Sequence, residues 1–355
     1  PDDPRMQQVT IRRILSHSSG LAHVRPEGSS TIPFVFDPGE KFGYSTEGLM
    51  MLSKAVEKIT GKKTETVMNE AVLAPLKMND SSFVWLDKYE KSAVSNHDSF
   101  GQPAGERYKH KRGLACCSML TTAADYAAFV IAAMDGKLLK RSTWTEMVKP
   151  QILLGEKTPQ LSWGLGWGIE KTQADEYLWH WGDNGISKSY VGASLRRKDA
   201  VVFFANSDNG LSFAKEILDL TVSGEHQSLA WLNYDRYDST GGRLFDAIIS
   251  NGAHAALKEH LIGRAKDPGI ALDESQMNVM GYKFLQSKRL DDAISIFAQN
   301  TIDHPNSANT WDSLAEAHMQ KGDTALAIKY YEKSLQLDPK NENAVAMLKK
   351  LKSEK

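Results

Sequence analysis

A change of hydrophobic period in the middle of the chain limits the possible folds most. Four short segments rich in β-branched and aromatic residues predict strands at residues 165–169, 177–181, 189–195 and 200–205. The gaps between these segments are short, and a parallel crossover needs about a dozen residues or more, so neighbouring strands must be antiparallel. The stretches before and after them have helical spacing. Helices on one long stretch and strands on another predict an α+β domain.

Two helices with one apolar face each are predicted at residues 47–60 and 121–135. We expect both to pack against the sheet, because each has an apolar face to bury. The turn at residues 37–39 combines Pro with Gly, and Tyr44 stands between that turn and the first helix. The turn and the buried helix would hold this phenol at a fixed point. Such a position suits a functional side chain, although ordinary packing is the simpler alternative.

The C-terminal part of the chain contains an internal repeat. The later copy has pattern residues at Trp311, Leu314, Ala315, His318, Ala327, Tyr331 and Pro339, and the same spacing places Met277, Met280, Gly281, Phe284, Ala293, Phe297 and Pro305 in the earlier copy. Small residues let the helices approach, and aromatic residues fill the groove between them. The pattern resembles two tetratricopeptide repeats followed by a closing helix.

We therefore expect three parts in the chain. Residues 1–224 form the α+β domain, residues 225–272 a connector with an amphipathic helix over 244–262, and residues 273–355 an all-α repeat domain. Because two repeats are few for independent stability, we expect them to lean on the connector helix. The concave face of such repeats binds a peptide or a partner protein, or it is filled by the connector itself.

Composition excludes several function classes. Hydrophobic residues are 41% of the chain and charged residues 25%, with a net charge of −1, so neither a nucleic acid nor an anionic membrane is an expected partner. No apolar run approaches the ~18 residues of a membrane span. The only cysteines, Cys116 and Cys117, are adjacent, so we expect small buried residues here and no disulfide. No metal or other cofactor is expected.

Several motifs of the first domain occur in a familiar order. They are VTIRRILSHSSGL at residues 9–21, YST at 44–46, TTAAD at 121–125 and WHWGDNG at 179–185. Together they resemble the serine beta-lactamase and penicillin-binding-protein-like hydrolases, and most closely the class C and esterase-like branch. The resemblance covers about residues 1–224. It implies acyl transfer from an amide or ester through an acyl-serine.

Three boxes carry the chemistry of that family, and two of them have counterparts here. The resemblance places the Tyr-x-Asn box at residues 44–46, with Thr46 instead of Asn, which argues against ordinary beta-lactam turnover. It places the Lys-Thr-Gly or His-x-Gly box at residues 180–182, followed by the amide expected to bind the oxyanion. The implied catalytic residues are Tyr44 and His180, and the implied substrate-binding residues are Thr46, Trp181, Gly182 and Asp183.

The remaining box, Ser-x-x-Lys, has no counterpart in the expected place. Its only occurrence is at residues 212–215, after the last predicted strand, whereas the family nucleophile precedes His17. Ser18 and Ser19 lack a nearby Lys and match a wall of the site. The chain starts at Pro1 without Met or a signal peptide. We therefore expect the nucleophile, the first helix and the remaining strands on a segment before residue 1, and the resemblance implies a periplasmic or secreted location.

Two functions remain open. The first is a serine hydrolase acting on a small-molecule or peptide substrate, either a beta-lactam, a D-amino peptide or a carboxylic ester. Without the upstream segment, this chain alone would be inactive. The second is a binding module that resembles a hydrolase and has lost its nucleophile, with the repeats as the surface that binds a protein or peptide. The sequence encoded upstream of Pro1 would distinguish them.

Overall fold

The computed structural model describes residues 3–353. The outermost residues of the expected first and last parts, 1–2 and 354–355, lie outside the described range. The chain divides into two compact units, Pro1–Tyr234 and Asp235–Lys355. The expected connector is therefore split, since its first helix belongs to the first unit and its later helices to the second.

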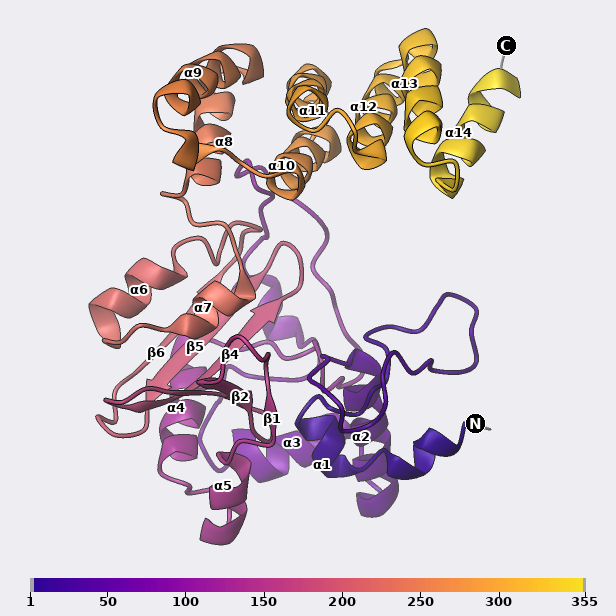
Figure 1. Ribbon diagram of the computed structural model, residues 1–355. Helices are drawn as coiled ribbons and strands as arrows, with labels where there is room; N and C mark the ends of the chain where they lie inside the picture. The colour runs from indigo at the N-terminus through magenta and orange to yellow at the C-terminus, as the bar shows by residue number, and fades with distance from the viewer. Residues whose placement is uncertain (1–2, 354–355) are drawn as a thin grey trace. The chain divides into compact units, whose positions relative to one another are not determined.

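An antiparallel sheet organises the first unit, as Figure 1 shows. Its strands follow one another in space in the order of the sequence, which confirms the predicted meander. They are β1 (Ile152–Leu153), β2 (Leu161–Trp163), β3 (Gly168–Lys171), β4 (Glu176–Asp183), β5 (Lys188–Ser194) and β6 (Ala200–Ala205). The first two strands were not predicted, because they are two and three residues long and too short to show a period.

Helices cover both faces of this sheet. Helix α4 (Ala123–Met134) packs on one face, in a cluster formed by Val130, Met134, Trp167, Ile169, Leu178, Val191 and Ala193. Helix α6 (Ala214–Thr221) packs on the other, in a cluster formed by Trp163, Tyr177, Trp179, Tyr190, Leu211, Ala214, Leu218 and Val222. Figure 1 shows the two helices on opposite sides of the strands. Burying each large apolar side chain contributes about 1.5–3 kcal/mol, so these clusters are the main source of stability.

Helix α2 (Thr46–Thr60) begins and ends as its sequence predicts. The Ser45 hydroxyl accepts a hydrogen bond from the Gly48 N–H, and Gly61 ends the helix at a φ of +67°. Its main neighbours are α1 (Ile11–Leu15) and α3 (Thr64–Met68), so the expectation that it packs mainly on the sheet is wrong. The reason is that its fully buried residues are the small Gly48 and Ser53, which offer little apolar surface to a sheet.

The remaining elements of the first unit are short. A π-turn (Asn69–Leu73) continues α3, and the other helices are α5 (Arg141–Met147), α7 (Gln227–Leu232) and the 3₁₀ helices Pro4–Gln8 and Asp87–Glu90. A long polar loop then joins the second of these 3₁₀ helices to α4. His97 in this loop donates its N–H to Asn206 O at 2.8 Å and accepts from the Asp208 N–H at 3.2 Å. These bonds tie the loop to the chain that leaves β6.

The second unit contains only helices. They are α8 (Thr240–Asn251), α9 (Ala253–Lys266), the 3₁₀ helix Pro268–Ile270, α10 (Glu274–Gln286), α11 (Leu290–Asp303), α12 (Ala308–Lys321), α13 (Thr324–Leu337) and α14 (Glu342–Ser353). The single helix expected over residues 244–262 is wrong. Gly252, at a φ of +79°, ends α8, and the Ala253 N–H that starts α9 donates to the Asp292 carboxylate at 2.7 Å. Among the described residues, no helix combines the length and apolar character that crossing a bilayer requires.

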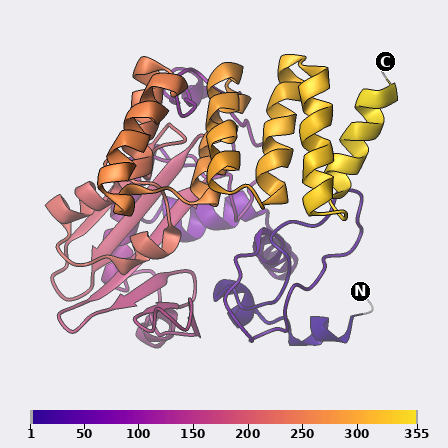
Figure 2. The same ribbon diagram turned by 45° about the horizontal axis from the view of Figure 1, so that its top comes forward.

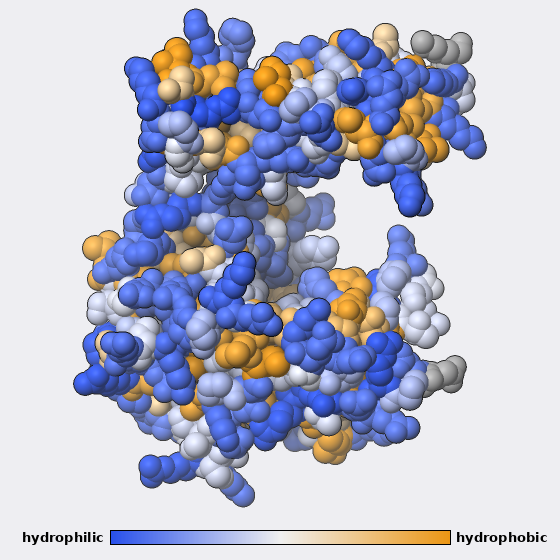
Figure 3. Space-filling model, viewed as in Figure 1, coloured by the Kyte–Doolittle hydropathy of each residue, from blue (hydrophilic) through white to orange (hydrophobic). Residues whose placement is uncertain are grey.

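The tetratricopeptide repeats are confirmed as helical hairpins, α10 with α11 and α12 with α13, followed by α14. Figure 2 shows them as successive upright helices in orange and yellow. The small residues lie where helices touch, since a Cβ on Gly281 would come within 2.4 Å of the Phe297 ring. In Figure 3, hydrophobic residues gather over α13 and α14, and the exposed apolar residues of these helices include Leu326 and Val345.

Replacing Gly281 with Ala tests this close packing. Alanine is the better helix former by about 1 kcal/mol, but the crowded Cβ costs about 1–3 kcal/mol. We expect Gly281→Ala to lower the free energy of unfolding of the second unit by about 1–2 kcal/mol, measured by urea denaturation followed by circular dichroism. Gly241→Ala in α8 is the matched control, because its Cβ would meet no atom closer than 3.8 Å. Equal stability changes in the two variants would contradict the packing argument.

Candidate active site

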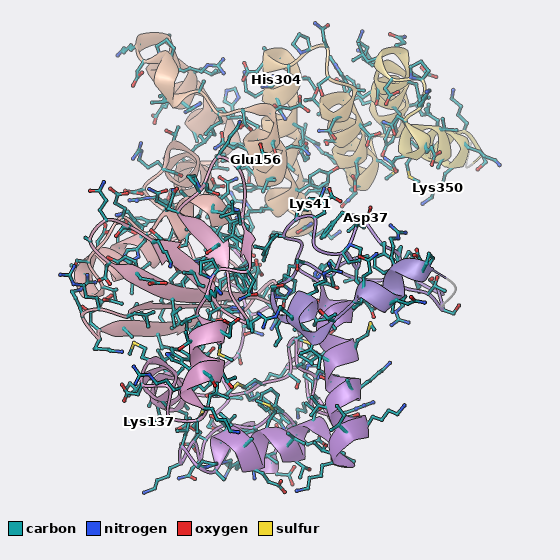
Figure 4. The ribbon with its side chains drawn as sticks, turned by 60° about the horizontal axis from the view of Figure 1, so that its bottom comes forward. Asp37, Lys41, Lys137, Glu156, His304 and Lys350 are labelled. Atoms are coloured by element: carbon teal, nitrogen blue, oxygen red, sulfur yellow. The ribbon has the colours of Figure 1, made fainter. Side chains whose placement is uncertain are left out.

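Tyr44 lies at the end of a loop that turns sharply before α2. Asp37 and Lys41, labelled in Figure 4, belong to this loop. Gly39 lies between them at a φ of +95°, a conformation that few residues other than glycine adopt. The turn predicted at residues 37–39 is therefore present, and it sends the chain back toward the preceding loop.

Backbone hydrogen bonds hold this loop against the preceding one. The Gly39 N–H donates to Ser18 O and the Gly43 N–H donates to His17 O, both at 2.7 Å. Residues 17–19 are buried, so both acceptor carbonyls belong to a buried loop, while Gly39 is exposed and Gly43 is half-buried. Because Gly43 directly precedes Tyr44, the second bond sets the point from which the phenol projects.

Each residue of the Tyr-Ser-Thr box contacts either the loop at residues 17–19 or the residues just after that loop. The Tyr44 and His17 ring centroids are 4.4 Å apart. The Ser45 hydroxyl donates to Ala22 O at 2.9 Å, and the Thr46 hydroxyl lies 3.1 Å from His23 Nδ1. The tyrosine is thus placed by ring packing and backbone bonds, and Thr46 is engaged with an imidazole.

Burial keeps the Tyr44 phenol protonated. Burial, with smaller contributions from the neighbouring Cys116 and Cys117, raises the pKa of Tyr44 to about 12. At neutral pH the phenol is therefore a hydrogen-bond donor. The expectation of two buried cysteines is wrong, since Cys116 is half-buried and Cys117 is exposed. Burial also raises the pKa of Cys116 to about 12, so its thiol is protonated and a poor nucleophile.

In the part of the chain that the structure describes, β4 has a free edge over its last residues. β3 pairs with β4 only as far as Trp179, so residues 180–183 have a strand neighbour only in β5. The Asn184 N–H donates to Ser187 O at 3.0 Å, so even-numbered amides of this strand point toward β5. Because amide directions alternate along a strand, the Asp183 N–H points to the free edge. An amide in this position is available to a ligand.

His180 is a neutral imidazole with a fixed tautomer. Its Nδ1 lies 2.7 Å from Trp181 O, and because a carbonyl oxygen only accepts, Nδ1 carries the proton. Burial lowers the pKa of His180, and the bond to the Trp181 carbonyl only partly opposes this effect. The ring therefore presents Nε2 as a hydrogen-bond acceptor at neutral pH.

Aromatic contacts join the two candidate catalytic residues into one cluster. Trp181 has its ring centroid 6.0 Å from that of Tyr44 and 5.7 Å from that of His180. Trp163 closes the cluster, with its centroid 5.1 Å from that of His180 and 5.4 Å from that of His17. Two segments far apart in sequence, the loop before α2 and the end of β4, thus meet through these rings.

The other two candidates lie at the end of β4. A Cβ on Gly182 would come within 2.4 Å of Ser189 Oγ, so the glycine makes room for a side chain of β5. The Asp183 carboxylate accepts from Lys188 Nζ at 2.6 Å and from the Tyr234 hydroxyl at 2.5 Å. Burial acts to raise the pKa of Asp183, but these hydrogen bonds outweigh it and lower the pKa. The buried Lys188 thus anchors the residue whose amide faces the free edge.

The family follows from comparison with known proteins. The family model described as beta-lactamase matches residues 1–223. The chain belongs to the beta-lactamase family. A second model, described as a tetratricopeptide repeat, matches residues 308–341. The family is one of serine hydrolases. All the residues of the matched segment that the structure describes belong to the first unit.

Individual relatives share parts of this beta-lactamase-like chain. Esterase EstB of Burkholderia gladioli is 30% identical over 128 residues, which are 28% of this chain and 32% of that protein, so this chain spans about a third of that relative's length. Two solved structures share the fold. One is an octameric penicillin-binding protein homologue from Pyrococcus abyssi, with 19% identity, a TM-score of 0.51 and coverage of 70% of this chain and 64% of that one. The other is a class C beta-lactamase, with 16% identity, a TM-score of 0.52 and coverage of 63% and 72%.

Sequence reasoning missed three residues of the candidate site. His17 was considered only as part of a wall loop, His23 was not singled out, and Trp163 lies on a strand that was not predicted. A usable signal existed only for His17, which stands in one of the family motifs. Its backbone φ of +50° and its buried, unpaired Nδ1 among the described residues could not be read from the sequence.

The free energy of unfolding should depend on pH in a way that shows His17 to be neutral in the folded protein. Burial, reinforced by His180 and His23, lowers its pKa to about 3, compared with about 6.5 when unfolded. Because the unfolded state binds the extra proton between these values, stability falls as the pH falls through this window. We expect His17 alone to cost about 3 kcal/mol between pH 7 and pH 4.

His17→Asn provides the comparison, because Asn tolerates a positive φ and does not titrate in this range. Urea midpoints followed by tryptophan fluorescence at several pH values should fall less steeply in the variant. Some acid sensitivity should remain, because the pKa of His180 is lowered in the same direction. Parallel pH profiles for the variant and the parent chain would contradict a neutral, buried His17.

Proposed function

We propose that this chain supplies most of the active site of a serine hydrolase that transfers an acyl group from an amide or ester. In this proposal the nucleophile belongs to a Ser-x-x-Lys segment ahead of residue 1. The observation that carries it is the meeting of Tyr44 with the end of β4, where a neutral imidazole and a free amide edge lie together. The family membership of residues 1–223 supports the reaction class.

Each group has a role that its protonation state allows. The Asp183 N–H at the free edge would donate to the oxyanion that forms when the carbonyl is attacked. The Tyr44 phenol, once deprotonated, would accept the proton of the nucleophile as it attacks and pass it to the leaving group, and it would do the same for the water that hydrolyses the acyl-enzyme. To accept, the phenol needs a nearby cation that lowers its pKa, and the lysine of the missing box would provide one. His180 would accept a hydrogen bond from substrate at Nε2.

The only Ser-x-x-Lys of this chain is a poor alternative nucleophile. Lys215 Nζ lies 2.5 and 2.6 Å from the two carboxylate oxygens of Asp219. The Lys215 side chain is thus engaged by Asp219. In the sequence the pair also comes after β6, and so after both segments that carry Tyr44 and His180.

The chain of residues 1–355 should therefore be inactive toward penicillins and p-nitrophenyl esters. Loss of the nucleophile in a serine hydrolase costs on the order of 10⁶ in kcat. We expect no acylation by a fluorescent penicillin, measured by gel fluorescence and peptide mapping, and no difference between the parent chain and Ser212→Ala. Stable acylation mapped to Ser212 would overturn the proposed assignment.

In a protein that also carries the Ser-x-x-Lys segment, Tyr44→Phe should impair turnover with little loss of stability. The ring and its packing on His17 stay, while general acid–base catalysis worth roughly 10² to 10⁴ in rate is lost. The measurements are esterase kcat and melting temperature on the same sample. Tyr89→Phe is the matched control, since its hydroxyl donates only to Asp80 O at 3.4 Å. Turnover within about threefold of wild type for Tyr44→Phe would exclude this tyrosine from catalysis.

A second function, peptide or protein binding by the repeats, is favoured by an open groove in the second unit. A hollow of about 730 Å³ is lined by α10, α12 and the start of α14. Helices α8 and α9 pack against α10 and α11 and so extend the array. This arrangement favours a groove that binds a partner over one filled by the connector.

A further inference from the structure

Two adjacent thiols face each other in a tight turn of the first unit. Cys116 and Cys117 are the only cysteines of the chain, and their Sγ atoms lie 2.8 Å apart. Cys116 is half-buried, whereas Cys117 is exposed. Adjacent side chains of an extended strand point to opposite faces, so this approach depends on the turn. The two sulfur atoms need little movement to form a bond.

Ser118 holds this turn at its C-terminal end. The residue is buried, and its hydroxyl accepts from the Leu114 N–H at 2.8 Å and donates to Phe83 O at 2.8 Å. The Ser118 N–H donates to Leu114 O at 3.4 Å and closes the turn. The backbone that carries the two cysteines is therefore fixed on both sides, at Leu114 and at Ser118.

The inner thiol packs on the helix that begins within the Tyr-Ser-Thr box. Cys116 Sγ lies 3.9 Å from Met50 Sδ. Met50 comes four residues after Thr46 on α2, so both side chains project from the same side of that helix. Because a thioether only accepts, the Cys116 S–H donates to Met50 and the Cys117 S–H donates to Cys116. The pair thus borders the candidate active site, and its outer thiol is the one that solvent reaches.

We propose that Cys116 and Cys117 form a redox modification site, at which a small-molecule disulfide oxidises the pair to a vicinal disulfide. The Cys117 thiolate attacks one sulfur of the reagent, whose sulfur–sulfur bond breaks and releases one thiol. Cys116 then loses its proton to solvent and attacks Cys117 Sγ, and the second half of the reagent leaves as a thiol. Two protein thiols are oxidised by two electrons, and the reagent is reduced to two thiols that take up the two protons. The inference does not depend on the proposed hydrolase or peptide-binding function.

Exposure and proton affinity set the order of the two steps. Burial, followed by the neighbouring Cys117, raises the pKa of Cys116 to about 12, so Cys116 reacts poorly with a reagent in solution. In the mixed disulfide Cys117 has lost its ionisable thiol, so its contribution to this shift disappears. The second attack is also intramolecular, and proximity compensates for a small thiolate fraction.

The product is a readily reversible bond. Neighbouring Cα atoms are about 3.8 Å apart, below the usual range of about 4.4–6.8 Å for a disulfide, so the vicinal bond is strained. Strained or exposed disulfides are the ones that cells reduce easily and use for regulation. The modification would therefore respond to the balance of thiols and disulfides around the protein.

Treating the full chain with dithiodipyridine, an aromatic disulfide, tests ring closure. We expect release of two pyridine thiols per chain, measured by absorbance, and a product whose mass is lower by two hydrogens. Dithiothreitol should restore both protein thiols. A product that keeps half of the reagent, or a dimer linked by disulfides, would overturn the inference.

Single variants test the order of attack. Cys116→Ser keeps the exposed thiol, so it should release one pyridine thiol and retain half of the reagent. Cys117→Ser keeps only the half-buried thiol, so its release should be slower by about tenfold or more. Equal rates in the two variants would contradict Cys117 as the first nucleophile.

The melting temperature separates a site that the fold builds from the chemistry of any Cys-Cys pair. A disulfide that distorts the native backbone destabilises the folded state. Because the folded turn already holds the two sulfur atoms face to face, the melting temperature of the oxidised chain should equal or exceed that of the reduced chain. A fall on oxidation would show that the fold resists the bond, and it would overturn the inference.

Discussion

The candidate active site depends on two backbone hydrogen bonds between neighbouring loops, from Gly39 to Ser18 and from Gly43 to His17. The loops can approach this closely only because a glycine faces the other chain. A Cβ on Gly20 would come within 2.3 Å of Phe36 O. Side chains can be exchanged around such a pair of loops without moving the backbone. The position of the Tyr44 phenol is therefore set by main-chain geometry, as proton transfer requires.

The second half of the site is also formed by main chain, namely the free edge of β4. The titratable groups of the site are neutral. Burial keeps His180 unprotonated and Tyr44 protonated, and among the described residues no cation acts on the phenol. The described site thus offers a donor, an acceptor and a free amide, but not the positive charge that turns a phenol into a base. In the proposed function, the lysine of a Ser-x-x-Lys segment would supply this charge.

The sequence predicted those parts of the fold that local rules determine. The meander and the helix predicted over residues 47–60 follow from period and turn chemistry, as does the turn that precedes Tyr44. Trp163 was missed because a strand of three fully buried residues has no alternation. The break at Gly252 was missed because the helical spacing continues in register beyond it, and a positive φ leaves no trace in the pattern. The role of His17 arises from packing between loops, which no local rule describes.

Comparison of the two repeats separates what the fold requires from what it only tolerates. Positions that keep helices close retain small residues in both copies, such as Gly281 and Ala315, and both are buried. The aromatic position keeps its ring in both copies, as Phe297 and Tyr331, and both rings are fully buried. The Tyr331 hydroxyl has no hydrogen-bond partner among the described residues, so the packing of the ring is what this position contributes to the fold. The first repeat, with Phe297 at this position, therefore serves as the internal control for the second.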